Sequence, residues 1–200
     1  MRKICLLLIL LMTSTMMAQG KKMKGGILNQ QAPEWKVDSW FNLPEGKETL
    51  TLADYKGKVI YLYFFQSWCP ACLKFGFPTL KQLQDKYKDN KDVAFVAVQT
   101  VFEGHNTNTV ETAKKIAKKF SLEIPFGQSG EKGKRSEIKK NYKAPGTPWT
   151  VIIGKNGEVK FNYFIIKPGE AEKLIDQELK AKVEENKKDE QKQVNNQQEK

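Results

Sequence analysis

The hydrophobic pattern of the chain centres on one uninterrupted run, Val59 to Phe65, made of β-branched, aromatic and aliphatic residues. A run of this length without polar alternation is typical of a strand buried on both faces, as parallel sheets require. Asp92 to Thr100 has a similar apolar content and predicts a second buried strand. Together the two segments predict the centre of a β-sheet.

Apolar residues at helical spacing follow these strands. Leu80, Leu83 and Tyr87 give a core face to a helix expected from residue 70 to about 87. Pro78 lies inside that helix and should kink it. The other expected elements are helices at about 109–120 and 169–183, short strands at 35–37 and 49–52, a helical turn at 52–57, a loop at 102–108, an extended piece at 124–126, a charged loop and helical turn at 131–142, and strands at 149–153 and 158–164 joined by the hairpin signal Asn156-Gly157.

The order of these elements predicts the fold class. Strands and helices alternate first, which favours parallel pairing, and a hairpin then adds antiparallel strands. We therefore expect an α/β protein with a central mixed β-sheet flanked by helices on both faces, preceded by an extra N-terminal strand pair. No internal repeat is visible.

The two ends of the chain differ from its middle. Residues 1–18 combine a charged start, an apolar run too short for a transmembrane helix and a small-residue cleavage site, which predicts a removed signal peptide or, as the alternative, a retained anchor. Residues 19–31 are expected to form a linker, 32–183 the folded domain and 184–200 a disordered polar tail. The signal peptide predicts a protein that is periplasmic or otherwise exported.

The net charge of +11 changes this picture little. Removal of Arg2 and Lys3 with the signal peptide leaves a basic protein whose lysines are scattered along helices and loops. Arginine is scarce and no aromatic and basic platform accompanies it, so we interpret the charge as surface solvation and expect no nucleic-acid binding. An anionic membrane surface or an acidic partner protein remains open.

The candidate chemistry lies in the five residues Trp68-Cys69-Pro70-Ala71-Cys72, between the first buried strand and the helix. Removal of Cys5 with the signal peptide leaves one cysteine pair in an exported protein, where disulfides persist. A static disulfide would close only a tiny loop and gain little stability. A structural zinc site usually needs four protein ligands, and the mature chain has two cysteines and one histidine. Copper held by two thiolates stays as an alternative.

A redox dithiol fits this position. A cysteine at a helix N-terminus lies beside unpaired backbone N–H groups and the positive end of the helix dipole, which stabilise negative charge on sulfur. We therefore expect Cys69 to be the nucleophile that attacks a substrate disulfide and Cys72 to resolve the mixed disulfide. The reverse sequence of steps would oxidise a dithiol.

Two separated motifs carry a family resemblance. The Trp-Cys-x-x-Cys sequence at 68–72 after an apolar strand, with Gly146-Thr147-Pro148 before a later strand, resembles the thioredoxin superfamily. The Ala32-Pro33 start and the run from Asp54 to Lys58 resemble its exported TlpA/ResA-like branch of redoxin-type thiol-disulfide oxidoreductases. The resemblance covers about residues 32–179.

The resemblance implies a fold and a site. It implies a thioredoxin-like fold without a cofactor or metal, protein disulfide or dithiol substrates, and a membrane thiol-disulfide electron donor. It also implies a cis peptide bond at Thr147-Pro148 beside the dithiol, with the Thr147 backbone free to pair with substrate. The expected catalytic residues are Cys69 and Cys72, and the expected substrate-binding residues are Trp68, Pro70, Thr147, Pro148 and Trp149, with both tryptophans forming an apolar rim.

The chain also departs from the family pattern. Tyr63 stands where thioredoxins have a buried aspartate, Phe75 stands where many TlpA/ResA-like proteins have a glutamate, and Pro78 lies one residue later than usual, which indicates an insertion near Gly76. The usual carboxylate for moving protons to the resolving thiol is thus missing. Candidate polar neighbours are Gln66, Gln99, Glu103 and His105. The threonine that peroxiredoxins place three residues before their reactive cysteine is Gln66 here, which argues against a peroxidase.

These observations favour an exported enzyme that reduces protein disulfides. The alternatives are a dithiol copper-binding module and a disulfide oxidase of the same fold. Pro70 directly after the nucleophile is shared with strongly oxidising members of the superfamily, so the sequence does not rank the two directions of electron flow.

Overall fold

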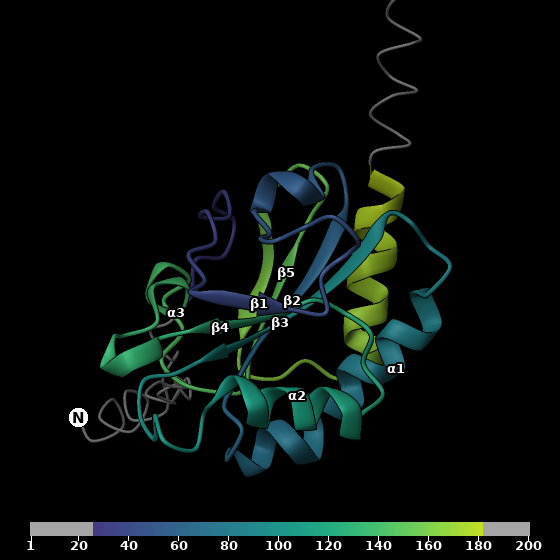
Figure 1. The fold of residues 1–200 in the computed structure, drawn as a ribbon. Helices are drawn as coiled ribbons and strands as arrows, with labels where there is room; N and C mark the ends of the chain where they lie inside the picture. Colours follow the sequence, from purple (N-terminus) through teal and green to yellow (C-terminus); the bar gives the residue numbers. More distant parts are fainter. Residues whose placement is uncertain (1–25, 182–200) are drawn as a thin grey trace, which may run out of the picture.

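The computed structural model describes residues 26–181. The predicted signal peptide at 1–18 and the predicted tail at 184–200 lie outside this range. Within it, a six-stranded sheet forms the centre of the molecule, with the strand order β1-β4-β3-β2-β5-β6 (Figure 1). The strands are β1 Ser39–Phe41, β2 Val59–Phe65, β3 Val93–Thr100, β4 Phe126–Ser129, β5 Trp149–Ile153 and β6 Val159–Tyr163.

The sheet is mixed, as the element order predicts. β2 pairs in parallel with β3, and β3 pairs in parallel with β4. β5 and β6 add antiparallel pairs on the other side of β2. All residues of β2 and β3 are buried, because both strands lie inside the sheet with side chains covered on both faces. The α/β fold class with a central mixed sheet is confirmed.

Helices cover the two faces unequally. The odd-numbered residues of β2 pack against α1 Phe77–Tyr87, α2 Val110–Lys119 and a C-terminal helix at residues 168–181. Its even-numbered residues face α3 Glu137–Asn141 and the N-terminal segment. The α1 helix and the C-terminal helix lie side by side (Figure 1), joined by the Tyr87 hydroxyl, which donates to Asp176 at 2.7 Å. The predicted final helix is thus present as far as residue 181.

The predicted N-terminal strand pair is wrong. Neither 35–37 nor 49–52 is a strand; a single short strand, β1, pairs antiparallel with β4 instead. Trp35 and Leu50 are buried from irregular backbone, so their apolar character reflects burial rather than strand pairing. The backbone N–H and the hydroxyl of Thr51 both donate to the Asp54 carboxylate instead of to a neighbouring strand. Thr51 thereby caps the short 3₁₀ helix η1 Leu52–Tyr55. That helix fulfils the prediction of a helical turn.

Two further boundaries differ from the prediction. The extended piece expected at 124–126 is replaced by strand β4, Phe126–Ser129. Its backbone pairs with both β3 and β1. Residues 26–31 belong to the fold rather than to a linker. Ile27 is buried, the Asn29 N–H donates to the Val159 carbonyl at 2.9 Å, and Gln31 forms a bridge with Glu158. The folded part therefore begins before Ala32.

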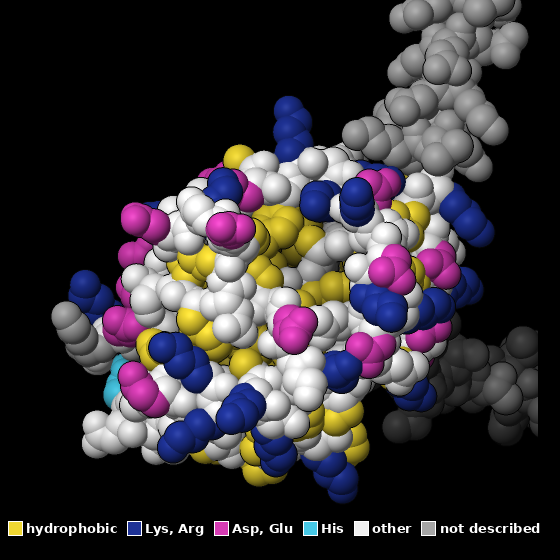
Figure 2. Space-filling model, turned by 45° about the vertical axis from the view of Figure 1, so that its right-hand side comes forward, with side chains coloured by type: hydrophobic (Ala, Val, Ile, Leu, Met, Phe, Trp, Pro, Cys, Tyr) yellow, Lys and Arg dark blue, Asp and Glu magenta, His cyan; other side chains and the backbone are white. Residues whose placement is uncertain are grey.

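The surface charge is dispersed. On the face shown in Figure 2, lysine and arginine side chains alternate with aspartate and glutamate side chains. Several lysines of the domain form ion pairs with acidic side chains, such as Lys86 with Glu172 at 2.8 Å. Exposed pairs contribute little to stability, and the pattern agrees with lysines scattered through the sequence.

Candidate active site

The dithiol lies where β2 gives way to a helix. Helical backbone begins at Pro70, one residue after Cys69, as the sequence predicts. The Cys72 N–H donates to the Cys69 sulfur at 3.3 Å. Both cysteines are free thiols, and the Cys69 side chain is 5% exposed whereas that of Cys72 is fully buried. The two sulfurs are therefore unequal, because only Cys69 reaches the surface.

The Thr147-Pro148 segment lies against Cys69. The Thr147-Pro148 peptide bond is cis, which confirms the conformation implied by the resemblance. The Cys69 thiol donates to the Thr147 carbonyl at 3.6 Å, and the Thr147 hydroxyl donates to the Gln66 side-chain oxygen at 3.5 Å. A segment far along the chain is thus brought beside the reactive sulfur.

The predicted substrate-binding residues divide into two groups. Trp68 is 46% exposed, Pro70 is exposed and Thr147 is half-buried, so these three can contact a partner. Pro148 is buried beside them.

Trp149 does not belong to the rim. It is fully buried, its indole N–H donates to the Asn162 side chain, and its ring packs edge-on against Phe164 at 4.9 Å. The prediction that Trp149 forms part of the apolar rim is wrong, because its place on β5 turns the side chain into the core.

Cys72 occupies an apolar pocket. The pKa of its thiol is raised to about 12, mainly by burial and secondarily by the neighbouring Cys69. Hydrogen bonding from the Gln66 backbone and from the Tyr63 hydroxyl acts in the opposite direction and lowers the pKa of the thiol. At neutral pH Cys72 is thus a thiol that must lose its proton before it can attack.

The helix after the dithiol contains a π segment, η2 Cys72–Gly76. Its closing bond runs from the Phe77 N–H to the Cys72 carbonyl. A π turn holds one residue more than an α turn, so it accommodates the insertion that the sequence indicates near Gly76. Pro78 then lies in the first turn of α1, where its missing N–H has no intrahelical partner. The sequence predicted a kink at Pro78 within one continuous α-helix. The irregularity lies instead in the π segment that precedes α1.

A buried polar network supports the other side of the dithiol. The Gln99 amide donates to the Gln128 side chain at 2.7 Å, and Gln128 donates to the Asn108 carbonyl at 2.9 Å. The Asn108 side-chain oxygen accepts the Ser67 N–H at 2.7 Å, and the Ser67 hydroxyl donates to Gln99. We name the side chains of Ser67, Gln99, Asn108 and Gln128 the amide network. It ties the residues just before Cys69 to β3, β4 and the loop at 102–108.

Sequence reasoning found only part of this network. Gln99 was expected as a polar neighbour, whereas Ser67, Asn108 and Gln128 were missed. Gln66 is also buried, and its amide donates to the Glu103 carbonyl at 3.2 Å. A glutamine within an apolar strand, as at Gln99 and Gln128, is the signal that pointed to buried hydrogen bonding.

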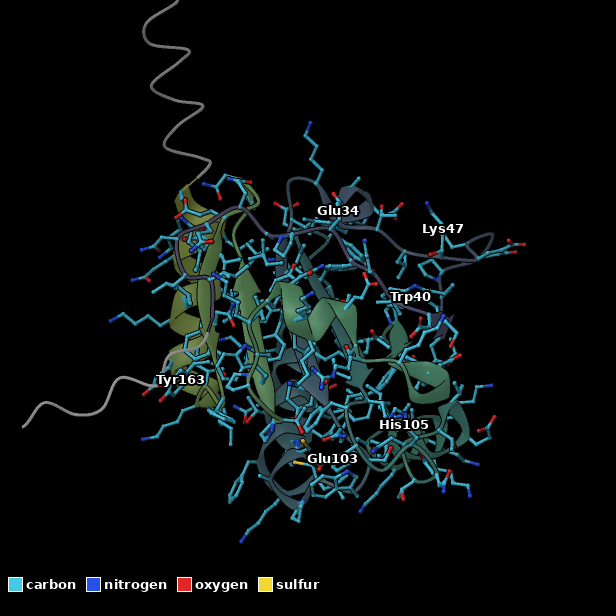
Figure 3. All side chains as sticks on the ribbon, turned by 90° about the vertical axis from the view of Figure 1, so that its left-hand side faces the viewer. Glu34, Trp40, Lys47, Glu103, His105 and Tyr163 are labelled. Atoms are coloured by element: carbon cyan, nitrogen blue, oxygen red, sulfur yellow. The ribbon has the colours of Figure 1, made fainter. Side chains whose placement is uncertain are left out.

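Glu103 and His105 lie on the loop beside this network (Figure 3). The Glu103 side chain is exposed, and its backbone carbonyl rather than its carboxylate serves Gln66 and Asn108. His105 lines a shallow pocket with Asn108 and Glu131. The expectation that Glu103 or His105 provides a polar side chain at the dithiol is therefore wrong, because the loop directs its backbone toward the site.

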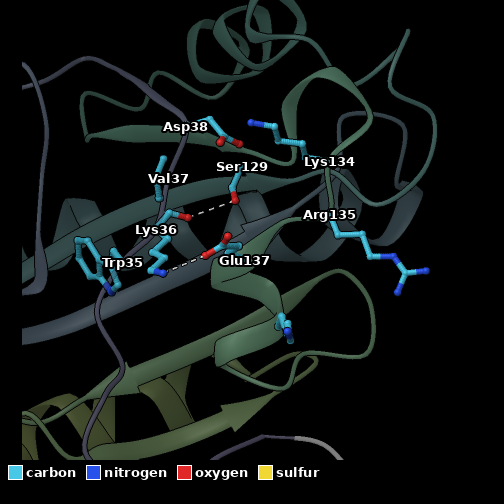
Figure 4. Close-up of a pocket in the computed structure, with 9 residues that line it drawn as sticks. Trp35, Lys36, Val37, Asp38, Ser129, Lys134, Arg135 and Glu137 are labelled. Carbon is cyan, nitrogen blue, oxygen red and sulfur yellow. Dashed lines mark hydrogen bonds and ion pairs between the residues drawn. The ribbon is translucent and has the colours of Figure 1, made fainter.

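A cavity of about 760 Å³ lies elsewhere, between residues 35–38 and α3 (Figure 4). Lys36 forms an ion pair with Glu137 at 3.3 Å across it, and its carbonyl accepts the Ser129 hydroxyl at 3.3 Å. Neither cysteine lines this cavity. This cavity is therefore separate from the dithiol.

Residues 26–181 contain neither a cluster of metal-ligating side chains nor a membrane-spanning helix. No three histidine, cysteine or acidic side chains lie close enough together there to hold a metal ion. No helix in the same range is long and apolar enough to cross a membrane.

Comparisons with known proteins agree with this geometry. A thioredoxin-like family model matches residues 57–159. The thiol-disulfide oxidoreductase ResA of Bacillus thuringiensis subsp. konkukian is 30% identical over 132 residues, covering 66% of each chain. ResA of Geobacillus kaustophilus is 32% identical over 109 residues, covering 54% of this chain and 56% of the relative. The chain therefore spans just under two thirds of the length of the first relative and less of the second.

Solved structures give the same result for the fold. The crystal structure of a thioredoxin-like superfamily protein has a TM-score of 0.67 and 30% identity, covering 74% of this chain and 96% of the other. A thiol-disulfide isomerase from Corynebacterium glutamicum has a TM-score of 0.63 at 24% identity, covering 73% and 95%. Because the family model matches more than half of the chain and its fold and cis-proline segment agree, this protein belongs to the thioredoxin-like family.

Proposed function

We propose that this protein is an exported thiol-disulfide oxidoreductase that reduces disulfides in other proteins. Cys69 attacks a substrate disulfide, one substrate sulfur leaves with the bonding electron pair and a proton, and a Cys69–substrate disulfide forms. Cys72 then loses its proton and attacks the Cys69 sulfur. The second substrate sulfur leaves as a thiol, and the Cys69–Cys72 disulfide remains.

The unequal placement of the two sulfurs is the observation that carries this proposal. Cys69 receives the Cys72 N–H at 3.3 Å and reaches the surface. Cys72 is buried, and its thiol is held protonated by the apolar pocket. A nucleophile that reaches the surface, with a fully buried partner one helical turn away, can form a mixed disulfide first and have it resolved afterwards.

The surface around Cys69 fits a protein substrate. Trp68 and Phe75 are 46% and 48% exposed, which is unusual for large apolar side chains this close to a reactive group. Gly104 approaches the Trp68 indole, so that a Cβ at residue 104 would lie 3.5 Å from the ring nitrogen. The loop at 102–108 thus packs beside the Trp68 indole at Gly104. Exposed aromatic side chains of this kind mark protein interaction sites.

Export and the electron donor belong to the same proposal. The charged and apolar sequence at residues 1–18 supports export, and the ResA relatives are named thiol-disulfide oxidoreductases. A disulfide left on Cys69 and Cys72 must be reduced again before the next cycle. In an exported protein, a membrane thiol-disulfide donor is the kind of partner that can supply those electrons.

Insulin reduction tests the proposal. The purified mature protein should accelerate insulin reduction by dithiothreitol, and the Cys69→Ser variant should not. Absence of turnover by the wild-type protein would sink the enzyme assignment. In that case tight, stoichiometric Cu(I) binding would support the copper-binding alternative, since two thiolates favour that ion.

The reduction potential tests the direction of electron flow. A value near that of thioredoxin, about −270 mV, would support the reductase, and a value near that of DsbA, about −120 mV, would support the oxidase. Equilibration with glutathione buffers, followed by thiol counting, provides the measurement.

A further inference from the structure

The position under the resolving cysteine is occupied by a tyrosine. Tyr63 points from β2 toward the first turn of the helix, and its hydroxyl donates to the Cys72 carbonyl at 3.4 Å. The ring is fully buried and packs edge-on against Phe77 at 5.2 Å. Its place is therefore fixed by the core, and its one polar atom is directed at Cys72.

The helix is shaped around this hydroxyl. A Cβ at residue 76 would overlap the Tyr63 hydroxyl and ring, so only glycine fits beside them. Gly76 has an ordinary helical backbone, with φ −67° and ψ −50°, so its conformation does not require glycine. The requirement comes from space alone. Gly76 also ends the π segment, whose extra residue moves the helix backbone away from regular α geometry at this point.

The Tyr63 side chain of β2 and the helix backbone from Cys72 to Gly76 fit one another closely. Tyr63 replaces the shorter acidic side chain that the family resemblance leads one to expect, and a phenol needs more room than a carboxylate. The π segment and Gly76 together provide that room. A bulky core residue alone would not account for a hydroxyl that is directed at Cys72, where it donates to the carbonyl at 3.4 Å.

We propose that the Tyr63 hydroxyl is the hydrogen-bond donor that stabilises negative charge on the Cys72 sulfur as this sulfur attacks the mixed disulfide. The proposal rests on the thiol-disulfide activity proposed above. In the step, the Cys72 thiol gives up its proton and forms a bond to the Cys69 sulfur. The bond from Cys69 to the substrate sulfur breaks, and the leaving substrate sulfur takes up a proton. Tyr63 keeps its own proton throughout.

The electrostatics agree with this role. Burial raises the pKa of Tyr63 well above its usual value, so the phenol stays protonated and remains a donor. Hydrogen bonding from the Gln66 backbone and, to a smaller extent, from Tyr63 lowers the pKa of the Cys72 thiol against the larger effect of burial. Hydrogen bonds to charged groups are stronger than neutral ones, so the contact strengthens as the thiolate forms.

A two-step reaction with dithiobis-nitrobenzoate separates the two cysteines. Attack by Cys69 releases one thionitrobenzoate and leaves the second on Cys69. Attack by Cys72 then releases the second, and stopped-flow absorbance follows each release. The Tyr63→Phe variant should show an unchanged first phase and a second phase slowed about tenfold or more. The dependence of the second phase on pH should move to higher pH.

Tyr61→Phe is the matched control. Tyr61 is buried on the same strand and faces the same side of the sheet, but its ring packs against Phe95 at 5.9 Å. Removing its hydroxyl should leave both phases unchanged. A Tyr63→Phe second phase within about twofold of the wild type would overturn the proposal, and so would equal slowing of both phases, since a general structural effect does not select Cys72.

Gly76→Ala gives a second route if Tyr63→Phe does not fold. The added methyl group displaces the hydroxyl from Cys72, and the second phase should slow selectively. A folded Gly76→Ala protein, judged by cooperative thermal unfolding, with a normal second phase would contradict the proposal. If the wild-type protein releases no thionitrobenzoate at all, the proposed function fails instead, so the two failures are distinguishable.

Discussion

Two different interiors flank the dithiol. Beneath Cys72, the odd-numbered face of β2 is aromatic, and Tyr63 carries the one polar atom directed at the cysteine. On the other side, beside Ser67, the amide network joins β3 and β4 to the loop at 102–108. Both interiors are buried, and they act in different ways.

The aromatic side affects the reactivity of Cys72, whereas the amide network fixes the position of the residues around the dithiol. The aromatic side removes water from Cys72 and so makes its thiolate costly, and hydrogen bonding from the Gln66 backbone and the Tyr63 hydroxyl reduces that cost. The hydrogen bonds of the amide network hold the Ser67 N–H and the Glu103 carbonyl in place, whereas the Cys69 sulfur hydrogen-bonds to the Thr147 carbonyl and the Cys72 N–H. Changes on the aromatic side should therefore alter rates at Cys72, and changes in the amide network should alter stability and the shape of the site.

Removal of the resolving thiol has the largest expected effect. The Cys72→Ser variant should lose insulin reduction almost completely, by about a hundredfold or more, and should accumulate a stable mixed disulfide through Cys69. Mass spectrometry after reaction with a disulfide-containing peptide measures that adduct. Normal turnover by Cys72→Ser would show that the buried thiol does not resolve the mixed disulfide and that the aromatic side has no role in the reaction.

The pH dependence of the second step tests the aromatic pocket itself. The pKa of Cys72 is raised to about 12, so its thiolate is a small fraction of the total below that pH. The rate of the second thionitrobenzoate release should rise about tenfold per pH unit between pH 6 and 9. A plateau near neutral pH would show that the pocket does not hold the thiol protonated.

Loss of one member of the amide network should destabilise the fold. The Gln99→Ala variant leaves Gln128 without a donor and opens a cavity, which should lower the free energy of unfolding by about 2–4 kcal/mol. Urea denaturation measures it. Gln82→Ala, at an exposed glutamine on α1, is the control and should cost less than about 0.5 kcal/mol. Equal effects of the two variants would argue against a stabilising network.

The smallest effect on stability is expected at Asp54, an exposed residue that belongs to neither side of the dithiol. Hydrogen bonds from Lys47 and from Thr51 lower the pKa of its exposed carboxyl from 3.8 to about 2. Because this pKa is lower in the folded state, its stabilisation is complete above about pH 4 and is lost as pH falls through 2. Asp54→Asn should cost less than about 1 kcal/mol near pH 7 and nothing near pH 2. Urea denaturation at both values checks this, and a loss that persists near pH 2 would contradict the ionic origin.

The neighbourhood of the dithiol shows where prediction from sequence ends. The insertion near Gly76 is visible as a spacing change, yet only the folded helix shows that a π segment contains it and that Tyr63 fills the space. Trp149 illustrates the opposite case. Its sequence position beside Pro148 suggested a surface role, whereas the register of β5 with β2 buries the ring.

Local patterns in the sequence determine much of this protein. The apolar run of β2, the helix starting after Cys69 and the hairpin after β5 depend on residues close together in the chain, so periodicity and turn residues reveal them. Tertiary structure alone decides the rest. The pairing of β1 with β4, the amide network from Ser67 to Gln128, and the meeting of Tyr63 with Gly76 join residues distant in sequence. Their contacts depend on packing in three dimensions, which no local pattern encodes.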